Sequence, residues 1–239
     1  KLGFPVFPLE YTNERTGDVS LGYKEDGYFA DAFINMLALL GWNPGTEQEL
    51  FSLDELVQSF DLKRVSKSGA KFSPEKTNWF NQQYLQKKSD EELTKLFIPV
   101  LVEKGISKDE KFVEKVVSLI KERAVFVSDF WNLSDFFFQT PLSYDEKAVK
   151  KAVKEDTKEV LENVVGLLNP IVDFTTENIQ NTIKNWITSN EIGFGKVMMP
   201  LRLALVGALQ GPDVFEIIEM IGKKETIKRI EKALENITV

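Results

Sequence analysis

The feature that most constrains this chain is a recurring signal for the start of an α-helix. A Ser followed three residues later by Glu allows the hydroxyl to cap the helix, while the glutamate reaches back to the amide of the capping residue. This pattern occurs at Ser52 with Glu55, Ser89 with Glu92, Ser107 with Glu110, and Ser143 with Glu146. Ser73-Pro74 adds a cap followed by proline at the first helical position, where proline is favoured. Strand signals of comparable strength are missing from the sequence, so we predict an all-α fold.

The first part of the chain is expected to be an extended linker. Residues 1–23 contain paired prolines and short β-leaning runs, without helical periodicity. The pattern changes at Tyr28, after which apolar residues recur at helical spacing, at Phe29, Phe33, Leu37 and Leu40. Gly41 is suited to cap this helix, and the following Asn43-Pro44-Gly45 predicts a turn. The linker is thus followed by a buried helix that ends at Gly41.

Two further groups of helices are predicted downstream. Apolar positions in the middle of the chain indicate antiparallel helices that share one core: Leu93, Phe97, Val100, Phe112, Val116, Leu119, Ile120, Phe130 and Trp131. The run Phe136-Phe137-Phe138 is expected to be core as well, rather than a platform for stacking bases. In the last section, one helix is predicted from Tyr144 into residues 161–168, and others follow it. The breaks at residues 85–89 and 140–143 are the best candidates for domain boundaries.

The residue types that the chain lacks exclude most familiar catalytic chemistry. It contains no Cys and no His, which rules out disulfides, Cys nucleophiles, His-based triads, and thiolate or imidazole metal sites. Paired carboxylates such as Glu91-Glu92 lie at predicted helix starts, where they interact favourably with the helix dipole, so they are assigned no acid–base role. No catalytic residue and no metal site are predicted. No apolar run approaches the roughly 18 residues that a membrane span requires.

A basic segment stands out against the acidic balance of the chain. The net charge of −7 argues against non-specific coating of nucleic acid, because neutralising phosphates requires clustered Lys and Arg. Such a cluster occurs between residues 60 and 76, which hold Lys63, Arg64, Lys67, Lys71 and Lys76 against Asp61 and Glu75. The Debye length at physiological salt is only about 8 Å, so a local cluster can hold phosphates on an acidic protein. The alternative is a solvated loop between helices.

An arginine within an apolar helix is the second candidate for a binding role. Arg202 lies between Leu201 and Leu203 in the largely apolar segment 193–207. Burying its charge unpaired would cost on the order of several kcal/mol, so the guanidinium is expected to face solvent or a ligand. Two interpretations stay open: an ion pair with a neighbouring carboxylate such as Asp213, and hydrogen bonding or stacking on an unpaired RNA base.

Three stretches occur in a fixed order along the chain. They are Gly27-Tyr28 through residues 35–42 and Pro44-Gly45; residues 51–56 followed by 60–68; and residues 200–205 followed by Gly207, Pro212, Phe215-Glu216 and 222–225. Single motifs of this length are weak, but their order and spacing match over nearly the whole chain. Together they resemble bacterial glutamyl-tRNA synthetases.

The Ser66-Lys67-Ser68 triplet also resembles the loop with which class I tRNA synthetases hold the phosphates of ATP. An ATP site of that kind needs a His-containing partner motif on a nucleotide-binding α/β fold. The sequence contains no His and no βαβ pattern. A complete enzyme that uses this triplet is therefore disfavoured.

The resemblance implies a division of the chain into three parts. Residues 1–86 would form a linker and a helical tRNA stem-contact module, residues 87–142 a first helical anticodon-binding lobe, and residues 143–239 a second one. It also implies a class I catalytic domain upstream of Lys1. We therefore expect the chain to be the C-terminal, tRNA-binding half of a longer protein.

The resemblance also implies the residues of two sites. Contacts to the tRNA stem and backbone are expected from Lys63, Arg64, Ser66, Lys67, Ser68 and Lys71. Contacts to the anticodon are expected from Arg202, Gly211, Pro212 and Val214, with Arg123 as the candidate for reading the third anticodon base. Gly69 stands where the family usually has proline after the Ser-Lys-Ser triplet, which leaves the rigidity of that loop open.

The function implied by the resemblance is tRNA recognition without chemistry. The fragment is expected to bind tRNA(Glu) as a cytoplasmic monomer, with no DNA, membrane or cofactor partner of its own. ATP and Mg²⁺ would be used by the catalytic domain of the parent ligase, which joins glutamate to its tRNA. The main alternative is a helical protein-interaction scaffold, which the acidic charge and the apolar helix faces equally allow.

Overall fold

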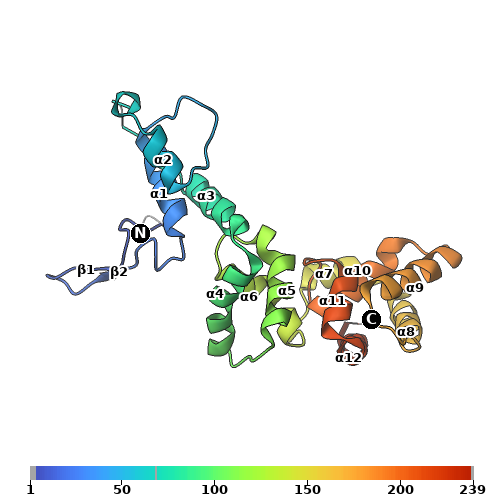
Figure 1. Ribbon diagram of the computed structural model, residues 1–239. Coiled ribbons are helices and arrows are strands. Elements are labelled where there is room, and N and C mark those ends of the chain that lie inside the picture. The colour runs from blue at the N-terminus through green and yellow to red at the C-terminus, as the bar shows by residue number, and fades with distance from the viewer. Residues whose placement is uncertain (1–3, 68, 238–239) are drawn as a thin grey trace. The chain divides into compact units, whose positions relative to one another are not determined.

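The computed structural model describes residues 4–67 and 69–237, in two compact units that divide between residues 133 and 134. The predicted all-α fold is confirmed, because helices make up most of the described chain (Figure 1). The strands within these residues are limited to β1 (Tyr11–Thr12) and β2 (Val19–Ser20), which pair antiparallel. No helix in the described part of the chain is long and apolar enough to cross a membrane. The predicted three-part division into residues 1–86, 87–142 and 143–239 stays a prediction.

In the first unit, residues 1–133, three helices begin with the hydroxyl caps that the sequence predicts. In chain order its helical elements are α1 (Ala30–Gly41), α2 (Leu53–Ser59), the 3-10 turn η1 (Leu62–Arg64), α3 (Pro74–Lys87), α4 (Asp90–Glu103), α5 (Glu110–Ile120), the 3-10 turn η2 (Lys121–Arg123) and the start of α6 (Asp129–Phe138). Ser52 and Ser89 form complete capping boxes, and Ser73 caps α3 with proline at its first position. These three predicted helix starts are confirmed.

Two predicted capping pairs are wrong, and for the same reason. Helix α5 starts at Glu110, but its cap is the carboxylate of Asp109 rather than Ser107. Helix α7 (Glu146–Ala152) starts at Glu146, but its cap is Asp145 rather than Ser143. In both cases an aspartate directly before the helix accepts a hydrogen bond from a first-turn amide, which makes the more distant serine unnecessary.

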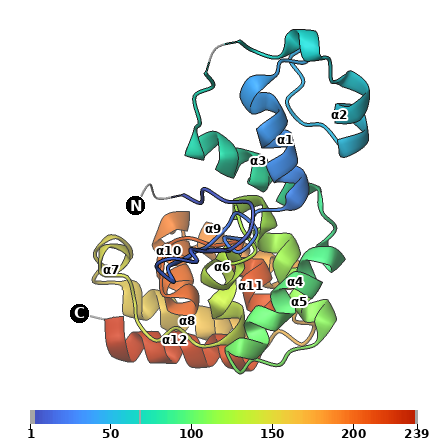
Figure 2. The same cartoon turned by 90° about the vertical axis from the view of Figure 1, so that its left-hand side faces the viewer.

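Helix α1 keeps part of the predicted face, because Phe29 and Phe33 pack against the core, but Leu37 does not. Leu37 is 48% exposed, whereas Ala32, Asn35 and Met36 are buried against α3. The side-chain amide of Asn35 donates to the Glu49 carbonyl at 3.0 Å and accepts from the Phe51 amide at 2.8 Å. Because these bonds satisfy a buried polar group, they fix which face of α1 turns inward. Both α2 and α3 lie against this helix (Figure 2).

The middle of the chain forms the predicted helical core. Leu93 and Phe97 on α4, Val116 and Ile120 on α5, and Phe130 on α6 are completely buried. The rings of Phe97 and Phe130 meet edge to face, with centroids 5.4 Å apart. The prediction that these residues share a core is confirmed.

The second unit, residues 134–239, is built from six helices and the end of α6 within the described residues. The six are α7 (Glu146–Ala152), α8 (Thr157–Leu168), α9 (Thr176–Ser189), α10 (Phe194–Val206), α11 (Val214–Ile221) and α12 (Lys223–Ile237).

The single helix predicted from Tyr144 into residues 161–168 is wrong. It is broken between Ala152 and Thr157, where the Thr157 hydroxyl accepts from the Lys154 amide. Phe136 and Phe137 are core residues, as predicted.

A buried arginine connects three helices of the second unit. Arg229 on α12 is only 2% exposed. Its Nη1 donates to the carbonyls of Phe136 on α6, at 2.6 Å, and Leu205 on α10, at 2.9 Å, while its Nε donates to Glu225 at 2.8 Å. Buried charges are tolerated when they are paired and hydrogen-bonded in this way. The side chain therefore ties α6, α10 and α12 together.

Replacing Arg229 with methionine tests this role. The substitution keeps most of the volume but leaves two carbonyls and the Glu225 carboxylate without their donor, so we expect a loss of about 3–5 kcal/mol of unfolding free energy. Arg123→Met, which changes an exposed arginine, should stay within about 0.5 kcal/mol of the original chain. Urea unfolding of both variants measures the difference, and equal stabilities would contradict the assignment.

The same cluster predicts a dependence of stability on pH. Partial burial alone would raise the pKa of the Glu225 carboxyl, but hydrogen bonds from Thr140 and Arg229 outweigh it and hold this pKa below its ordinary value. A depressed carboxyl pKa stabilises the fold above the unfolded-state pKa of about 4.3, and this contribution is lost as the pH falls through the folded-state value. The stability difference between the original chain and Glu225→Gln should therefore be largest near pH 7 and should shrink below about pH 4. A difference that does not change from pH 7 to pH 3 would rule this out.

Candidate nucleic-acid interface

The predicted stem-contact segment is held in place by backbone pairing. The Ser66 amide donates to the Gly41 carbonyl at 2.8 Å, and an isolated bridge joins Trp42 to Val65. Asp61 caps the preceding 3-10 turn by accepting from the Lys63 amide. The lysines at positions 63 and 67 therefore flank a fixed stretch of backbone. Ser68 lies outside the described residues.

The basic residues of this segment have different surroundings. Arg64 donates to the carbonyl of Pro44, and its guanidinium lies against Gly45, where a Cβ would come within 2.8 Å of Nη1. Gly45 has a φ of +78°, which favours glycine, so Arg64 holds a tight turn. Lys76 is paired with Glu49 at 2.5 Å and lies over the Trp79 ring. Lys63, Lys67 and Lys71 are exposed, as is Arg64 apart from its contact with the turn.

In the second unit, three of the predicted anticodon residues come together. Arg202 on α10 is partly buried, and its Nη1 donates to the carbonyl of Pro212 at 2.7 Å. Gly211 has a φ of +126°, and a Cβ there would lie 3.4 Å from the same nitrogen and 3.5 Å from the Phe136 ring. The guanidinium thus orders the loop between α10 and α11.

Val214 and Asp213 are placed by the start of α11. Val214 is 2% exposed as a whole residue, so it packs in the core rather than facing a ligand. The Asp213 carboxylate accepts from the Phe215 amide at 2.8 Å and caps the helix. The sequence left two interpretations of Arg202 open, an ion pair and a contact to RNA. The structure shows a further role, because the Arg202 guanidinium bonds to the Pro212 carbonyl and so positions the Gly211-Pro212 loop.

Arg123 belongs to the first unit and ends the 3-10 turn η2. The side-chain amides of Gln82 and Gln86 on α3 both donate to the Glu122 carbonyl, at 3.3 and 3.0 Å, and so fix this turn. Next to it, Lys121 pairs with Asp90 at 2.6 Å. Arg123 itself is exposed. The turn therefore presents the arginine to solvent from an ordered backbone.

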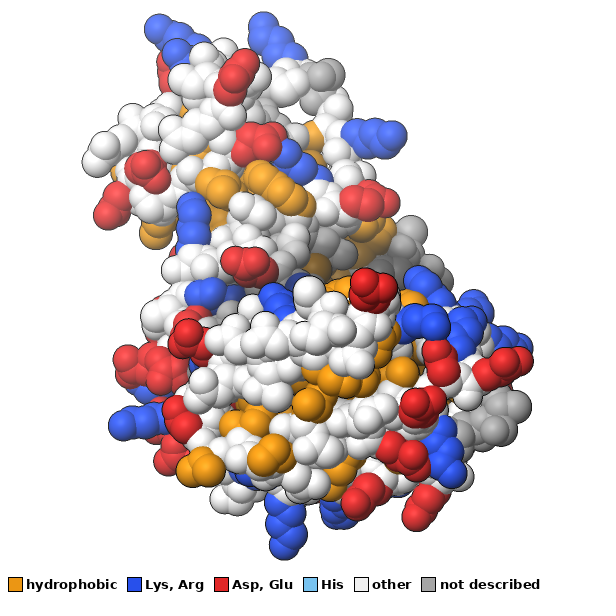
Figure 3. Space-filling model, turned by 90° about the vertical axis from the view of Figure 1, so that its right-hand side faces the viewer, with side chains coloured by type: hydrophobic (Ala, Val, Ile, Leu, Met, Phe, Trp, Pro, Cys, Tyr) orange, Lys and Arg blue, Asp and Glu red, His pale blue; other side chains and the backbone are white. Residues whose placement is uncertain are grey.

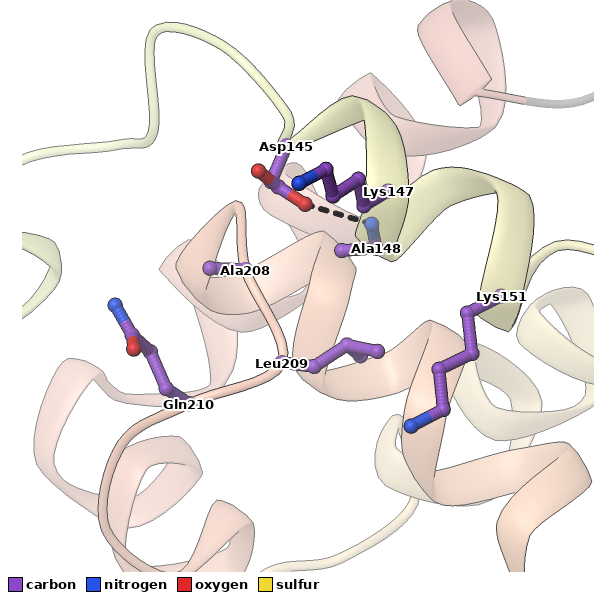
Figure 4. Close-up of a pocket in the computed structure, with 7 residues that line it drawn as sticks. All are labelled: Asp145, Lys147, Ala148, Lys151, Ala208, Leu209 and Gln210. Carbon is purple, nitrogen blue, oxygen red and sulfur yellow. Dashed lines mark hydrogen bonds between the residues drawn. The ribbon is translucent and has the colours of Figure 1, made fainter.

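The sequence reasoning missed a cavity of about 430 Å³ beside the same loop of the second unit. Its lining residues are Asp145, Lys147, Ala148, Lys151, Ala208, Leu209 and Gln210 (Figure 4). The available signal was the pair of lysines four residues apart in segment 147–151, which places both on one side of a helix. The cavity extends the candidate surface from the Gly211-Pro212 loop to α7.

Charge is mixed on one face of the molecule. On the face drawn in Figure 3, acidic and basic side chains are interspersed and neither sign covers the surface. Within the described residues there is no group of three or more His, Cys, Asp or Glu side chains that could hold a metal ion. The arrangement is therefore suited to binding through a few local contacts.

Two family models match the chain. The anticodon binding domain model matches residues 92–234, which is more than half of the chain. The model of the catalytic domain of class I tRNA synthetases for E and Q matches residues 14–79, which include the predicted stem-contact segment.

Comparisons with known proteins give one consistent result. The chain is 60% identical over 235 residues to a glutamate–tRNA ligase of Flavobacterium psychrophilum and 58% identical over 234 residues to that of Flavobacterium johnsoniae, in each case covering 98% of this chain and 46% of the relative. It thus spans about half the length of the relatives it matches.

Solved structures agree with the sequence comparison. A crystal structure of a glutamate tRNA ligase from Elizabethkingia meningosepticum in complex with its amino acid matches with a TM-score of 0.94 and 48% identity, over 99% of this chain and 47% of that one. The glutamate-tRNA synthetase of Elizabethkingia anophelis matches with a TM-score of 0.91 at the same identity, over 98% of this chain and 46% of that one. The predicted family is confirmed: the chain belongs to the anticodon-binding-domain family, in the form found in glutamate–tRNA ligases.

Proposed function

We propose that this chain binds tRNA(Glu) and recognises its anticodon for a glutamate–tRNA ligase. The observation that carries the proposal is the convergence of Arg202, Gly211 and Pro212 on one loop of the second unit, inside the segment that matches anticodon-binding domains. An arginine presents several donors in a fixed plane, which suits the edges and faces of unpaired bases. The loop is held by its own helix, so the donors are ordered before RNA arrives.

The exposed lysines of the first unit have a different role in this proposal. Lys63, Lys67 and Lys71 contact phosphates of the tRNA stem, which position the RNA without reading its sequence. Arg64 acts indirectly, because its guanidinium is engaged with the Pro44-Gly45 turn. Arg123 extends the reading of the anticodon to its third base. Specificity therefore lies in the arginines, and the lysines contribute affinity that depends on salt.

The activity of the whole protein is part of the same proposal. The ligase joins glutamate to tRNA with ATP and Mg²⁺, in the cytoplasm. Residues 14–79 match the catalytic-domain model, but the ATP site itself is supplied by the part of the protein outside this chain. No step is assigned to a metal or nucleotide within the described residues, whose carboxylates form no metal-binding group. Nothing in the comparisons favours the alternative of a protein-interaction scaffold.

The direct test is a gel-shift or filter-binding titration of the 239-residue chain with a glutamate tRNA and with a non-cognate tRNA, across a salt series. We expect tighter binding of the glutamate tRNA and a linear fall of log K with log salt concentration. Binding of both tRNAs with equal affinity at every salt concentration would contradict anticodon recognition. Failure to bind either tRNA would contradict the whole proposal.

Removal of the exposed lysines tests the phosphate contacts. Lys63→Ala combined with Lys67→Ala should weaken binding of both tRNAs about equally and should make the salt slope shallower by roughly 0.7–0.9 for each phosphate that a lysine no longer neutralises. The matched control removes Lys24 and Lys111, two exposed lysines of the same unit outside the segment. An unchanged slope in the first variant, or the same change in both, would exclude this segment as a phosphate-binding surface.

Substitution of Arg202 tests base reading. Arg202→Ala should reduce binding of the glutamate tRNA by about 1–3 kcal/mol if the guanidinium bonds to a base. Binding of a glutamate tRNA with an altered anticodon should fall much less, since that ligand never made the contact. The ratio of the two affinities is therefore the measurement.

The bond to Pro212 adds a structural effect that must be separated from recognition. Loss of this bond should lower the melting temperature of the alanine variant, because a hydrogen bond from a charged donor contributes roughly 1.5–3 kcal/mol. A lowered melting point with an unchanged affinity ratio would make Arg202 a purely structural residue. Such a result would remove it from the recognition site.

A further inference from the structure

We propose that the cavity between α7 and the loop at residues 207–210 holds a backbone phosphate of the bound RNA next to the anticodon, with Lys147 and Lys151 as its cations. This inference rests on the proposed function and adds two contact residues to it. Neither lysine lies in the three stretches that resemble glutamyl-tRNA synthetases. Three features support a phosphate site: the residues that line the cavity, their charges, and the position of the cavity beside the Gly211-Pro212 loop.

The cavity has walls of different chemistry. Lys147 and Lys151 lie four residues apart on α7, so both project from one side of the helix, and both are exposed. Ala208 and Leu209 supply an apolar surface, and the exposed amide of Gln210 lies on the loop side (Figure 4). Two ammonium groups with an amide beside an apolar surface suit a phosphate that carries a sugar.

The one carboxylate of the cavity is already used. Asp145 Oδ1 accepts from the Ala148 amide at 2.7 Å and caps α7. The cavity therefore contains two lysines against a single aspartate that is hydrogen-bonded to the helix. This local balance is opposite in sign to the net charge of −7 for the whole chain, and local charge decides phosphate binding at physiological salt.

The cavity is continuous with the proposed base-reading loop. Gly207 ends α10, and its carbonyl accepts from the Asp145 amide at 2.8 Å. At the other end of the loop, Arg202 holds the Pro212 carbonyl. Gln210 lines the cavity and directly precedes Gly211, so the two sites are one residue apart, or about 3.8 Å between Cα atoms. An RNA strand with a base at Gly211-Pro212 must place a neighbouring phosphate close by.

The helix also offers a matched control. Lys150 is exposed and lies between the two proposed contacts in sequence, but it lines a different cavity, with Tyr144, Val149 and Lys232. Replacing Lys150 with alanine removes one positive charge, as replacing Lys147 or Lys151 does, but from another side of α7. Lys158 on α8, whose side chain is 67% exposed, completes a control pair.

The experiment compares two double variants of the 239-residue chain in binding to a glutamate tRNA. Lys147→Ala with Lys151→Ala should weaken binding about tenfold near 0.1 M salt and flatten the salt slope by roughly one to two. The preference for the cognate anticodon should be unchanged, because phosphate contacts do not specify sequence. Lys150→Ala with Lys158→Ala should change the affinity less than about twofold. Lys147→Arg with Lys151→Arg should restore binding, since the charge is kept.

Phosphate ethylation interference locates the contact. Ethylation of phosphates next to the anticodon should block binding by the original chain and should have no effect on binding by the Lys147→Ala, Lys151→Ala variant. Equal losses in the two double variants, or an unchanged interference pattern, would overturn the inference while leaving tRNA recognition intact. If the original chain binds no tRNA, the proposed function fails and the inference fails with it.

Discussion

The second unit depends on the burial of one positive charge. Removing Arg229 from water lowers the pKa of its guanidinium, and the hydrogen bond and charge of Glu225 oppose this shift. The bond to Glu225 is local, because that residue lies four positions away on α12. The bonds to the carbonyls of Phe136 on α6 and Leu205 on α10 are long-range. Leu205, whose carbonyl is the acceptor on α10, lies two residues before Gly207. The buried cation therefore sets where the candidate recognition loop begins.

A second arginine then orders the far end of the same loop. Arg202 bonds to Pro212, so the loop is attached to α10 at its end as well as at its origin. A loop fixed at both ends loses little conformational entropy when a ligand binds, which preserves affinity for the contacts themselves. As a consequence, stability and the proposed recognition would share the Arg202 side chain, and the two roles can be separated only by comparing ligands.

Several features could be predicted from the sequence because they are local. The caps at Ser52, Ser73 and Ser89 depend on residues within one helical turn. The burial of Asn35 on α1 could not be predicted, because it depends on bonds to residues 14 and 16 positions away. The role of Arg64 was also hidden, since its partner in the Pro44-Gly45 turn is 20 residues distant. The burial of Arg229 could not be predicted either, because nothing distinguishes this arginine from the other charged residues of its helix.

The close packing around Gly207 limits which residues relatives of this chain can have at that position. Its φ of +82° is left-handed, and a Cβ would come within 2.7 Å of the Ser143 carbonyl, so any side chain must push the α6–α7 connection away from α10. That displacement would change the shape of the cavity that Lys147 lines, because the lining residue Asp145 is bonded to Gly207, and it would alter no charge. The absence of a side chain at Gly207 thus sets the spacing between α10 and the α6–α7 connection, which offers relatives a way to change the shape of the proposed phosphate site without changing its charged residues.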